Sequence, residues 1–122
     1  MGPGHENRVV LVIDDEPAIR LLCRVNLELG GYHVLEAASI EQARGQLDAG
    51  VDAVLLDLHL GRDHGYELLD ELRERGIPVA IVTGSTDLEI AAGHRADAVL
   101  GKPFTIVDLE STVATLTSSV GR

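Results

Sequence analysis

Apolar residues are concentrated in five short runs, and the segments between these runs carry apolar residues three or four positions apart. A short continuous apolar run is typical of a strand that is buried on both faces of a parallel sheet. Apolar residues at the longer spacing are typical of a helix with one buried face. The five expected strands are Val9–Ile13, His33–Glu36, Asp52–Leu56, Val79–Val82 and Ala98–Leu100.

The first helix is predicted over Pro17–Leu29. Proline is favoured in the first turn of a helix, and two glycines follow the predicted end. Apolar residues recur at helical spacing along one stripe of this helix, and we expect that stripe to face the core. Its members are Ala18, Leu22, Val25 and Leu29.

Four more helices are predicted on similar grounds. Ser39 and Gln42 form a capping box that opens the second helix, which ends at Gly50. The segment Ser85–Arg95 predicts the weakest helix, because Gly93 interrupts it. The spacing in the last helix would also fit a coiled-coil seam, but the helix is too short for one and is expected to pack on the core. The remaining two helices are Gly65–Arg75, with Leu68, Leu69 and Leu72 inward, and the segment after Thr105, with Ile106, Leu109, Val113, Leu116 and Val120 inward.

Strands and helices therefore alternate along the whole chain. Such a chain forms a parallel sheet with helices on both faces and right-handed crossovers. We expect an α/β fold, a flavodoxin-like (βα)5 doubly wound sheet of five parallel strands in the order 2-1-3-4-5. The length of 122 residues fits one domain, which we place at residues 8–120. Residues 1–7 carry no periodic pattern and are expected to be a disordered N-terminus or a remnant of cloning.

The composition is acidic, with a net charge of −10. A nucleic-acid-binding surface needs a basic face, and an anionic membrane attracts basic segments, so neither partner is expected. No apolar run is long enough to span a membrane and no signal peptide is evident, which favours a cytoplasmic protein. The single cysteine, Cys23, excludes an intrachain disulfide and is expected in the core.

Acidic residues follow two of the predicted strands. Asp14 and Asp15 come after the first strand, and Asp57 comes after the third. These two strands are neighbours in the expected order, so the three carboxylates meet at the carboxyl edge of the sheet. Carboxylates at such close range repel one another unless a cation lies among them. Oxygen ligands suit Mg²⁺, and Mn²⁺ is an alternative.

Residues at the ends of the fourth and fifth strands complete a site at this edge. Lys102 would neutralise part of the acidic charge, Thr83 would donate a hydrogen bond, and Gly84 leaves room for a ligand. Phosphoryl transfer to a carboxylate needs such a set, because the phosphoryl oxygens must meet cations and hydrogen-bond donors. Taken singly, Asp14 and Asp15 could cap the first helix, and Lys102 could be a solvated surface residue.

Four stretches carry these residues: VVLVIDDEP, VLLDLHL, IVTG and LGKPF. Together they resemble the receiver domain of response regulators in two-component signalling, and the resemblance runs from Arg8 to the last helix. It implies that Asp57 accepts a phosphoryl group from a histidine kinase or a histidine phosphotransfer protein. It also implies that Thr83 and Lys102 contact the phosphoryl oxygens, and that the peptide bond between Lys102 and Pro103 is cis.

The same resemblance implies a Mg²⁺ site. Asp15 looks like the direct ligand beside Asp57, whereas Asp14 acts largely through water. The metal would also take the backbone carbonyl of His59. In relatives, the positions of His59 and Ser85 tune access of the hydrolytic water, although a solvated loop histidine is an equal alternative for His59.

The chain departs from the family pattern mainly outside the acidic cluster. Val99 stands where receivers often carry an aromatic residue that moves together with the threonine. The segment from Thr83 to Lys102 is short, mostly at the expense of the fourth helix. Gly61 replaces a common proline, and His64 replaces a common aspartate. These features are similar to receivers with a short fourth helix, either stand-alone or linked to a kinase.

Three functions compete. The first is a signalling switch, not an enzyme, in which phosphorylation of Asp57 alters binding to a downstream protein target; a monomer or weak homodimer is expected. The alternative is a non-phosphorylated pseudo-receiver acting as a constitutive interaction module, but it would lack an acid, the threonine or the lysine, and none is missing. The third is an enzyme or cofactor binder of related architecture, which the residues disfavour. A phosphatase would need a second acid where His59 stands, and a nucleotide enzyme would need a glycine-rich loop. A flavin binder would need aromatic residues, which are nearly absent.

Overall fold

Five parallel strands form a single sheet in the order β2-β1-β3-β4-β5. The computed structural model describes residues 8–60, 62–84 and 96–118. The strands are β1 (Val9–Ile13), β2 (His33–Ala37), β3 (Ala53–Asp57), β4 (Val79–Gly84) and β5 (Ala98–Lys102). The predicted α/β fold and its strand order are confirmed.

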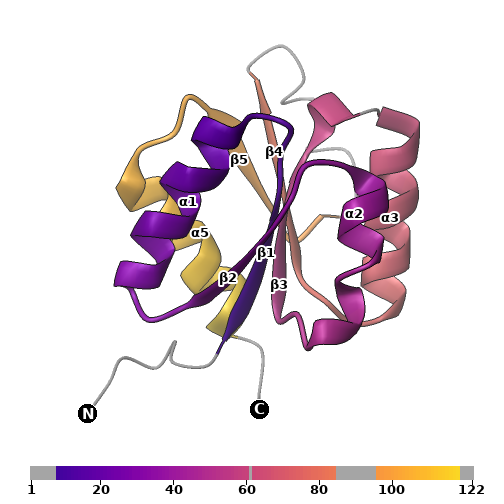
Figure 1. Ribbon diagram of the computed structural model, residues 1–122, viewed down its shortest axis with the longest axis horizontal. Helices are drawn as coiled ribbons and strands as arrows, with labels where there is room; N and C mark the ends of the chain where they lie inside the picture. Colours follow the sequence, from indigo (N-terminus) through magenta and orange to yellow (C-terminus); the bar gives the residue numbers. More distant parts are fainter. Residues whose placement is uncertain (1–7, 61, 85–95, 119–122) are drawn as a thin grey trace.

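Helices cover both faces of this sheet, as Figure 1 shows. The helices α1 and α5 pack on one face, and α2 and α3 pack on the other. Their bounds are Pro17–Leu29 for α1, Ile40–Arg44 for α2, Arg62–Glu74 for α3 and Ile106–Ser118 for α5. The predicted helix Ser85–Arg95 lies outside the described residues. No helix within the described residues is long and apolar enough to cross a membrane.

The core consists of two apolar layers, one on each face of the sheet. Successive strand residues point to opposite faces, so Leu55 packs in the layer under α1 and α5, while Leu56 packs in the layer under α2 and α3. As predicted, Leu68, Leu69 and Leu72 of α3 are buried. Because both faces are covered, an inner strand can be apolar along most of its length, which explains the continuous runs of β1 and β3.

The carboxyl ends of the strands lie at one level, and this positions the polar residues that follow them. Ile13 of β1 pairs with Leu56 of β3, and Asp57 is the next residue along β3. Gly84 of β4 pairs with Lys102, the last residue of β5. The residues at the ends of β1, β3, β4 and β5 therefore gather at one edge of the sheet.

The buried stripe of α1 differs from the predicted one. Cys23 and Leu27 face the sheet, and Ile19 is partly buried against the same layer. The four residues expected inward are exposed, and the exposed fraction of Leu29 reaches 81%. The incorrectly placed residues are Ala18, Leu22, Val25 and Leu29. This prediction was wrong because α1 carries apolar residues on two stripes, and helical spacing fits both equally well.

Polar contacts explain why α1 adopts this rotation. Arg20 and Arg24, one turn apart on α1, both bind the carboxylate of Glu36 on β2, at 3.1 Å from Nε and 2.7 Å from Nη1, respectively. These contacts hold one side of the helix beside β2. The neighbouring stripe of Cys23 and Leu27 is thereby turned to the sheet.

Two helices begin or end away from their predicted positions. The α-helix α2 ends at Arg44, and Leu47 belongs to a separate 3₁₀ turn. Gly45 follows Arg44, and glycine disfavours continuation of a helix. α3 begins at Arg62 rather than at Gly65, because its polar first turn carries no apolar period that the sequence pattern could detect.

Side chains cap the starts of α2 and α5. Ser39 caps α2 as predicted, although the side chain of Gln42 bonds to Ala38 and not to Ser39 as a capping box requires. The backbone N–H of Gln42 donates to Oγ of Ser39 at 3.1 Å, and Oε1 of Gln42 accepts from the backbone N–H of Ala38 at 2.7 Å. At α5, the backbone N–H of Asp108 donates to Oγ1 of Thr105 at 3.0 Å. These bonds satisfy backbone donors that the helix itself leaves free.

Cys23 is expected to be unreactive in the folded protein. Burial raises the pKa of its thiol to about 12, and the negative charge of Asp14 adds to the shift. Because the thiolate is the nucleophile, iodoacetamide at pH 8 should leave native Cys23 unmodified and alkylate it after unfolding, where the pKa is roughly 8.5. The thiol has a higher pKa in the folded protein than in the unfolded protein, so its protonated form favours folding. This contribution to the free energy of unfolding is complete below the unfolded pKa and is lost as pH rises through the folded pKa. Equal alkylation rates of native and unfolded protein would contradict this expectation.

Candidate functional site

Asp14, directly after β1, is buried and has all of its polar atoms in hydrogen bonds. Its Oδ1 accepts from the backbone N–H of Glu16 at 2.9 Å, and its Oδ2 accepts from Nζ of Lys102 at 3.0 Å. Its backbone N–H donates to the carbonyl of Ala37 at 3.0 Å, and its carbonyl accepts from Nη1 of Arg20 at 2.7 Å. The carboxylate therefore holds one fixed orientation at the sheet edge.

The structure brings the three predicted acids together. Asp14, Asp15 and Asp57 each offer a carboxylate oxygen, and these oxygens lie within 4.8 Å of one another. Asp57 is only 1% exposed at the end of β3, whereas Asp15 is open to solvent. An all-oxygen donor set with one solvent-facing member fits Mg²⁺, which takes few carboxylates and keeps several waters.

Lys102 supplies a positive charge to this cluster. Its Nζ lies 3.0 Å from Oδ2 of Asp14 and 3.5 Å from Oδ2 of Asp57. Burial acts to lower the pKa of Lys102, but the hydrogen bond to Asp14 and the charges of both acids outweigh it and raise the pKa above its ordinary value. The ammonium is therefore charged at neutral pH and offsets part of the repulsion between the acids.

Thr83 lies near the end of β4 with a buried hydroxyl. Its Oγ1 makes no hydrogen bond to any residue that the structure describes. Strand alternation places it on the same face as Ile81, and its backbone pairs with Gly101 of β5. A buried hydroxyl without a partner is unfavourable, so an oxygen-bearing ligand at the sheet edge would satisfy it.

The other predicted site residues lie around this edge. His59 belongs to the 3₁₀ turn Leu58–Leu60, directly after Asp57, so its backbone carbonyl is close along the chain to the acid. A Cβ added at Gly84 would meet no atom within 4 Å among the described residues. The peptide bond before Pro103 is cis. Val99 is half-buried against the layer under α2 and α3, and Ser85 lies outside the described residues.

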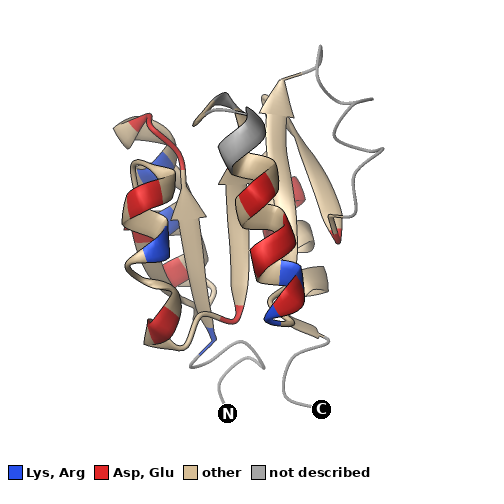
Figure 2. Ribbon diagram, turned by 90° about the vertical axis from the view of Figure 1, so that its right-hand side faces the viewer, with Lys and Arg blue, Asp and Glu red and all other residues tan. Residues whose placement is uncertain are grey.

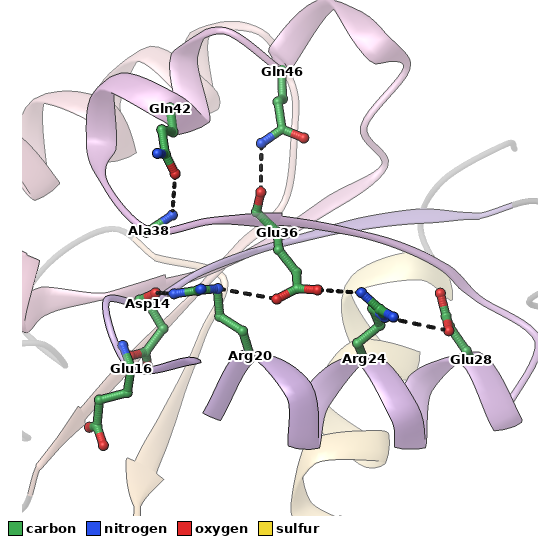
Figure 3. A network of polar contacts seen from close by, with 9 residues as sticks. All are labelled: Asp14, Glu16, Arg20, Arg24, Glu28, Glu36, Ala38, Gln42 and Gln46. Carbon is green, nitrogen blue, oxygen red and sulfur yellow. Dashed lines mark hydrogen bonds and ion pairs between the residues drawn. The ribbon is translucent and has the colours of Figure 1, made fainter. Parts of the chain in front are cut away.

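Sequence reasoning missed a chain of ion pairs next to Asp14 (Figure 3). Arg20 contacts both the carbonyl of Asp14 and the carboxylate of Glu36, and the second oxygen of Glu36 binds Arg24. Nε of Arg24 also lies 3.8 Å from Oε1 of Glu28 on the next turn of α1. A charged residue within an otherwise apolar parallel strand, such as Glu36, is the signal that could have revealed this network.

Acidic residues also lie along the exposed side of α3 (Figure 2). Few basic residues lie among these acidic ones. One of the acidic residues, Glu71, forms an ion pair with Arg44 of α2, with 2.8 Å between its Oε1 and Nη1 of Arg44. The acidic residues of α3 whose side chains the structure describes are Glu67, Asp70, Glu71 and Glu74. The expectation that this domain has no nucleic-acid partner stays a prediction based on charge.

Comparison with known proteins adds a family to this geometry. The family model of the response regulator receiver domain matches residues 10–114. The chain is 36% identical over 109 residues to the KDP operon transcriptional regulatory protein KdpE of Escherichia coli, covering 84% of this chain and 48% of KdpE. It is 35% identical over 99 residues to the transcriptional regulatory protein CpxR of Klebsiella pneumoniae, covering 78% of this chain and 43% of CpxR.

A solved structure agrees in fold. The receiver domain of NtrX from Brucella abortus superposes with a TM-score of 0.80 at 28% sequence identity, covering 90% of this chain and 98% of that domain. The chain spans less than half the length of KdpE and CpxR, so the activities of those whole proteins are not carried over to it.

The family match and the geometry agree with each other. Receiver domains are signalling domains that interact with histidine kinases. The acids, Thr83 and Lys102 are all present, so the pseudo-receiver alternative gains no support. From its sequence match, its strand order and its acidic edge, the chain belongs to the family of response-regulator receiver domains.

Proposed function

We propose that this domain, residues 8–120, accepts a phosphoryl group on Asp57 from a phosphohistidine of a histidine kinase or a histidine phosphotransfer protein, in a reaction that depends on Mg²⁺. One observation carries the proposal. The buried carboxylate of Asp57 lies at the same sheet edge as the oxygens of Asp14 and Asp15 and the ammonium of Lys102. This arrangement supplies an acceptor, a set of hard ligands and a cation at one place.

Asp57 is the proposed nucleophile. One of its carboxylate oxygens bonds to phosphorus while the phosphorus–nitrogen bond of the phosphohistidine breaks. The histidine leaves as neutral imidazole, since its other ring nitrogen carries the proton, and Asp57 becomes an acyl phosphate. Burial of Asp57 limits the access of water that would hydrolyse this product.

The other residues hold the transferring group. Asp15 is the proposed direct Mg²⁺ ligand with Asp57 and the backbone carbonyl of His59, and Asp14 acts through water. Mg²⁺ bound there would neutralise charge on the phosphoryl oxygens. Lys102 lies 3.5 Å from Asp57 and would bind a second phosphoryl oxygen.

Thr83 is proposed to link the phosphoryl group to the rest of the domain. Its buried hydroxyl makes no hydrogen bond within the described residues and would donate to a phosphoryl oxygen. That contact would favour one arrangement of the end of β4 and so change binding of a downstream protein target. Val99 offers no aromatic ring, so the switch would work without the rotation of an aromatic side chain. The domain is proposed to act as a monomer or a weak homodimer.

Intact-mass measurement tests the proposal directly. The protein is incubated with Mg²⁺ and acetyl phosphate, and separately with a phosphorylated histidine kinase. We expect a mass gain of one phosphoryl group that is stable in acid and labile in base, and that does not form when a chelator is present before the phosphodonor is added.

Asp57→Asn is the matched control, because the amide keeps the size of the side chain and removes the nucleophilic carboxylate. We expect no mass gain in this variant. A gain that persists in Asp57→Asn would assign the modification to another residue and overturn the proposal. No gain in the unaltered protein with either phosphodonor would overturn it as well.

A further inference from the structure

Arg20 lies at the centre of the contacts that fix the acidic loop between β1 and α1. Its Nη1 donates to the backbone carbonyl of Asp14 at 2.7 Å, and its Nε donates to Oε1 of Glu36 on β2 at 3.1 Å. Arg20 is mostly buried, and it reaches the loop from the first turn of α1. One side chain thus ties the loop, the helix and β2 together (Figure 3).

We propose that Arg20 is a positioning residue for the metal site, acting through the carbonyl of Asp14 on the direction of the Asp15 side chain. The inference rests on the proposed function, since it assumes that Mg²⁺ binds at the acidic edge. Arg20 itself contributes no ligand atom, because a guanidinium has donors only.

The physical argument starts from the peptide unit that joins Asp14 to Asp15. The peptide is planar, so a hydrogen bond that fixes its carbonyl oxygen also fixes its plane. The backbone N–H of Asp14 is held in addition by the carbonyl of Ala37 at 3.0 Å. With both sides of Asp14 fixed, the direction in which the exposed Asp15 leaves the backbone is restricted before any metal arrives.

Glu36 keeps Arg20 in place and balances its charge. The carboxylate of Glu36 receives Nε of Arg20 on one oxygen and Nη1 of Arg24 on the other. Its own backbone carbonyl accepts from Nε2 of Gln46 at 2.7 Å, which fixes this part of β2. A guanidinium close to the acids would otherwise repel a metal ion, and the paired carboxylate offsets this repulsion.

Positioning and simple charge effects predict opposite results for the loss of Arg20. If Arg20 acts only as a nearby positive charge, Arg20→Met removes repulsion and tightens Mg²⁺ binding. If Arg20 positions the loop, the same change leaves Asp14 and Asp15 less well oriented and weakens Mg²⁺ binding. Loss of a residue that orients metal ligands typically weakens affinity by about 10-fold or more.

Calorimetric titration with Mg²⁺ of the unphosphorylated protein gives the first readout. We expect the dissociation constant to rise about 10-fold in Arg20→Met. Arg24→Met is the matched control, because Arg24 is the same residue type on the same helix and binds the same Glu36 without touching the loop. Its dissociation constant should stay within about 2-fold of the unaltered protein, the range expected for an exposed ion pair.

The Mg²⁺ dependence of phosphorylation gives a second readout that a mere loss of folded protein would not move. In Arg20→Met, the Mg²⁺ concentration for half-maximal rate should rise in parallel with the dissociation constant, and the maximal rate should recover at saturating Mg²⁺. If Arg20→Met does not fold, Arg20→Lys replaces it, because lysine keeps the positive charge and loses the fork of donors that joins the Asp14 carbonyl to Glu36. Positioning then predicts a smaller rise in the dissociation constant, whereas a simple charge effect predicts no change.

The outcomes separate this inference from the function beneath it. If the unaltered protein binds Mg²⁺ and Arg20→Met binds it equally or more tightly, the positioning role is wrong and the proposed function stands. Equal weakening in Arg20→Met and Arg24→Met would also overturn the positioning role. If the unaltered protein shows no Mg²⁺ binding, the proposed function itself fails.

Discussion

Replacing Lys102 by methionine is expected to lower the free energy of unfolding by about 3 kcal/mol at pH 7, because it leaves buried carboxylates without their cation. Asp14 and Asp57 are almost completely buried, and Nζ of Lys102 lies 3.0 and 3.5 Å from their Oδ2 atoms. Methionine keeps most of the length of the side chain, so the loss is chiefly electrostatic. Urea unfolding followed by circular dichroism measures it.

Added Mg²⁺ should distinguish an electrostatic loss from a packing loss. A metal ion that binds only the folded state stabilises it, and in Lys102→Met it also supplies the missing positive charge. We therefore expect Mg²⁺ to stabilise Lys102→Met more than it stabilises the unaltered protein. Lys102→Arg, which keeps the charge, should lose less stability than Lys102→Met. An unchanged urea midpoint in Lys102→Met would contradict the expectation.

Truncating Leu27 to alanine is expected to destabilise the fold by about 3 kcal/mol, as for other large-to-small changes in a packed core. Leu27 is 0% exposed and lies in the same apolar layer as Cys23 and as Leu109 and Val113 of α5. The change removes buried apolar atoms and leaves a cavity between α1, α5 and the sheet. Urea unfolding again provides the measurement.

Leu29→Ala is the matched control on the same helix. Leu29 is largely exposed, and a surface substitution of this kind should change stability by no more than about 0.5 kcal/mol. The stripe inferred from periodicity alone would require the opposite order, with Leu29→Ala the more damaging change. A larger loss of stability for Leu29→Ala than for Leu27→Ala would therefore show that the stripe containing Leu29 is the buried one.

The sequence pattern predicts the strands and their order better than it predicts the faces of α1. A strand covered on both faces can be apolar throughout, so a run such as Val9–Ile13 can be recognised as a strand from the sequence directly. An amphipathic helix must in addition choose a rotation, and α1 has apolar residues on both candidate stripes. The rotation depends on Arg20 and Arg24 meeting Glu36, a contact across 12 to 16 positions that no local period encodes.

The acidic edge could be anticipated for a related reason. Parallel strands of one sheet end at the same edge, so residues that follow β1 and β3 must converge there. Asp14, Asp57 and Lys102 are therefore placed together by strand order alone. The contact between Arg20 and the carbonyl of Asp14 was missed because every residue has a backbone carbonyl. The residue types along the chain therefore do not indicate which carbonyl accepts a hydrogen bond.

The position of β5 in the sheet bears on how long Lys102 stays beside the acidic residues. Within the described residues, β5 is the outermost strand of the sheet and pairs only with β4, and Lys102 is its last residue. Release of β5 from β4 would withdraw Lys102 from Asp14, its partner 88 positions earlier in the chain, while the inner strands stay paired. Openings of this kind require less free energy than complete unfolding. Hydrogen exchange at the β5 amides would therefore report how often Lys102 is withdrawn from the acidic residues in an otherwise folded molecule, and under the proposed function such a molecule lacks one of the groups that bind the phosphoryl oxygens.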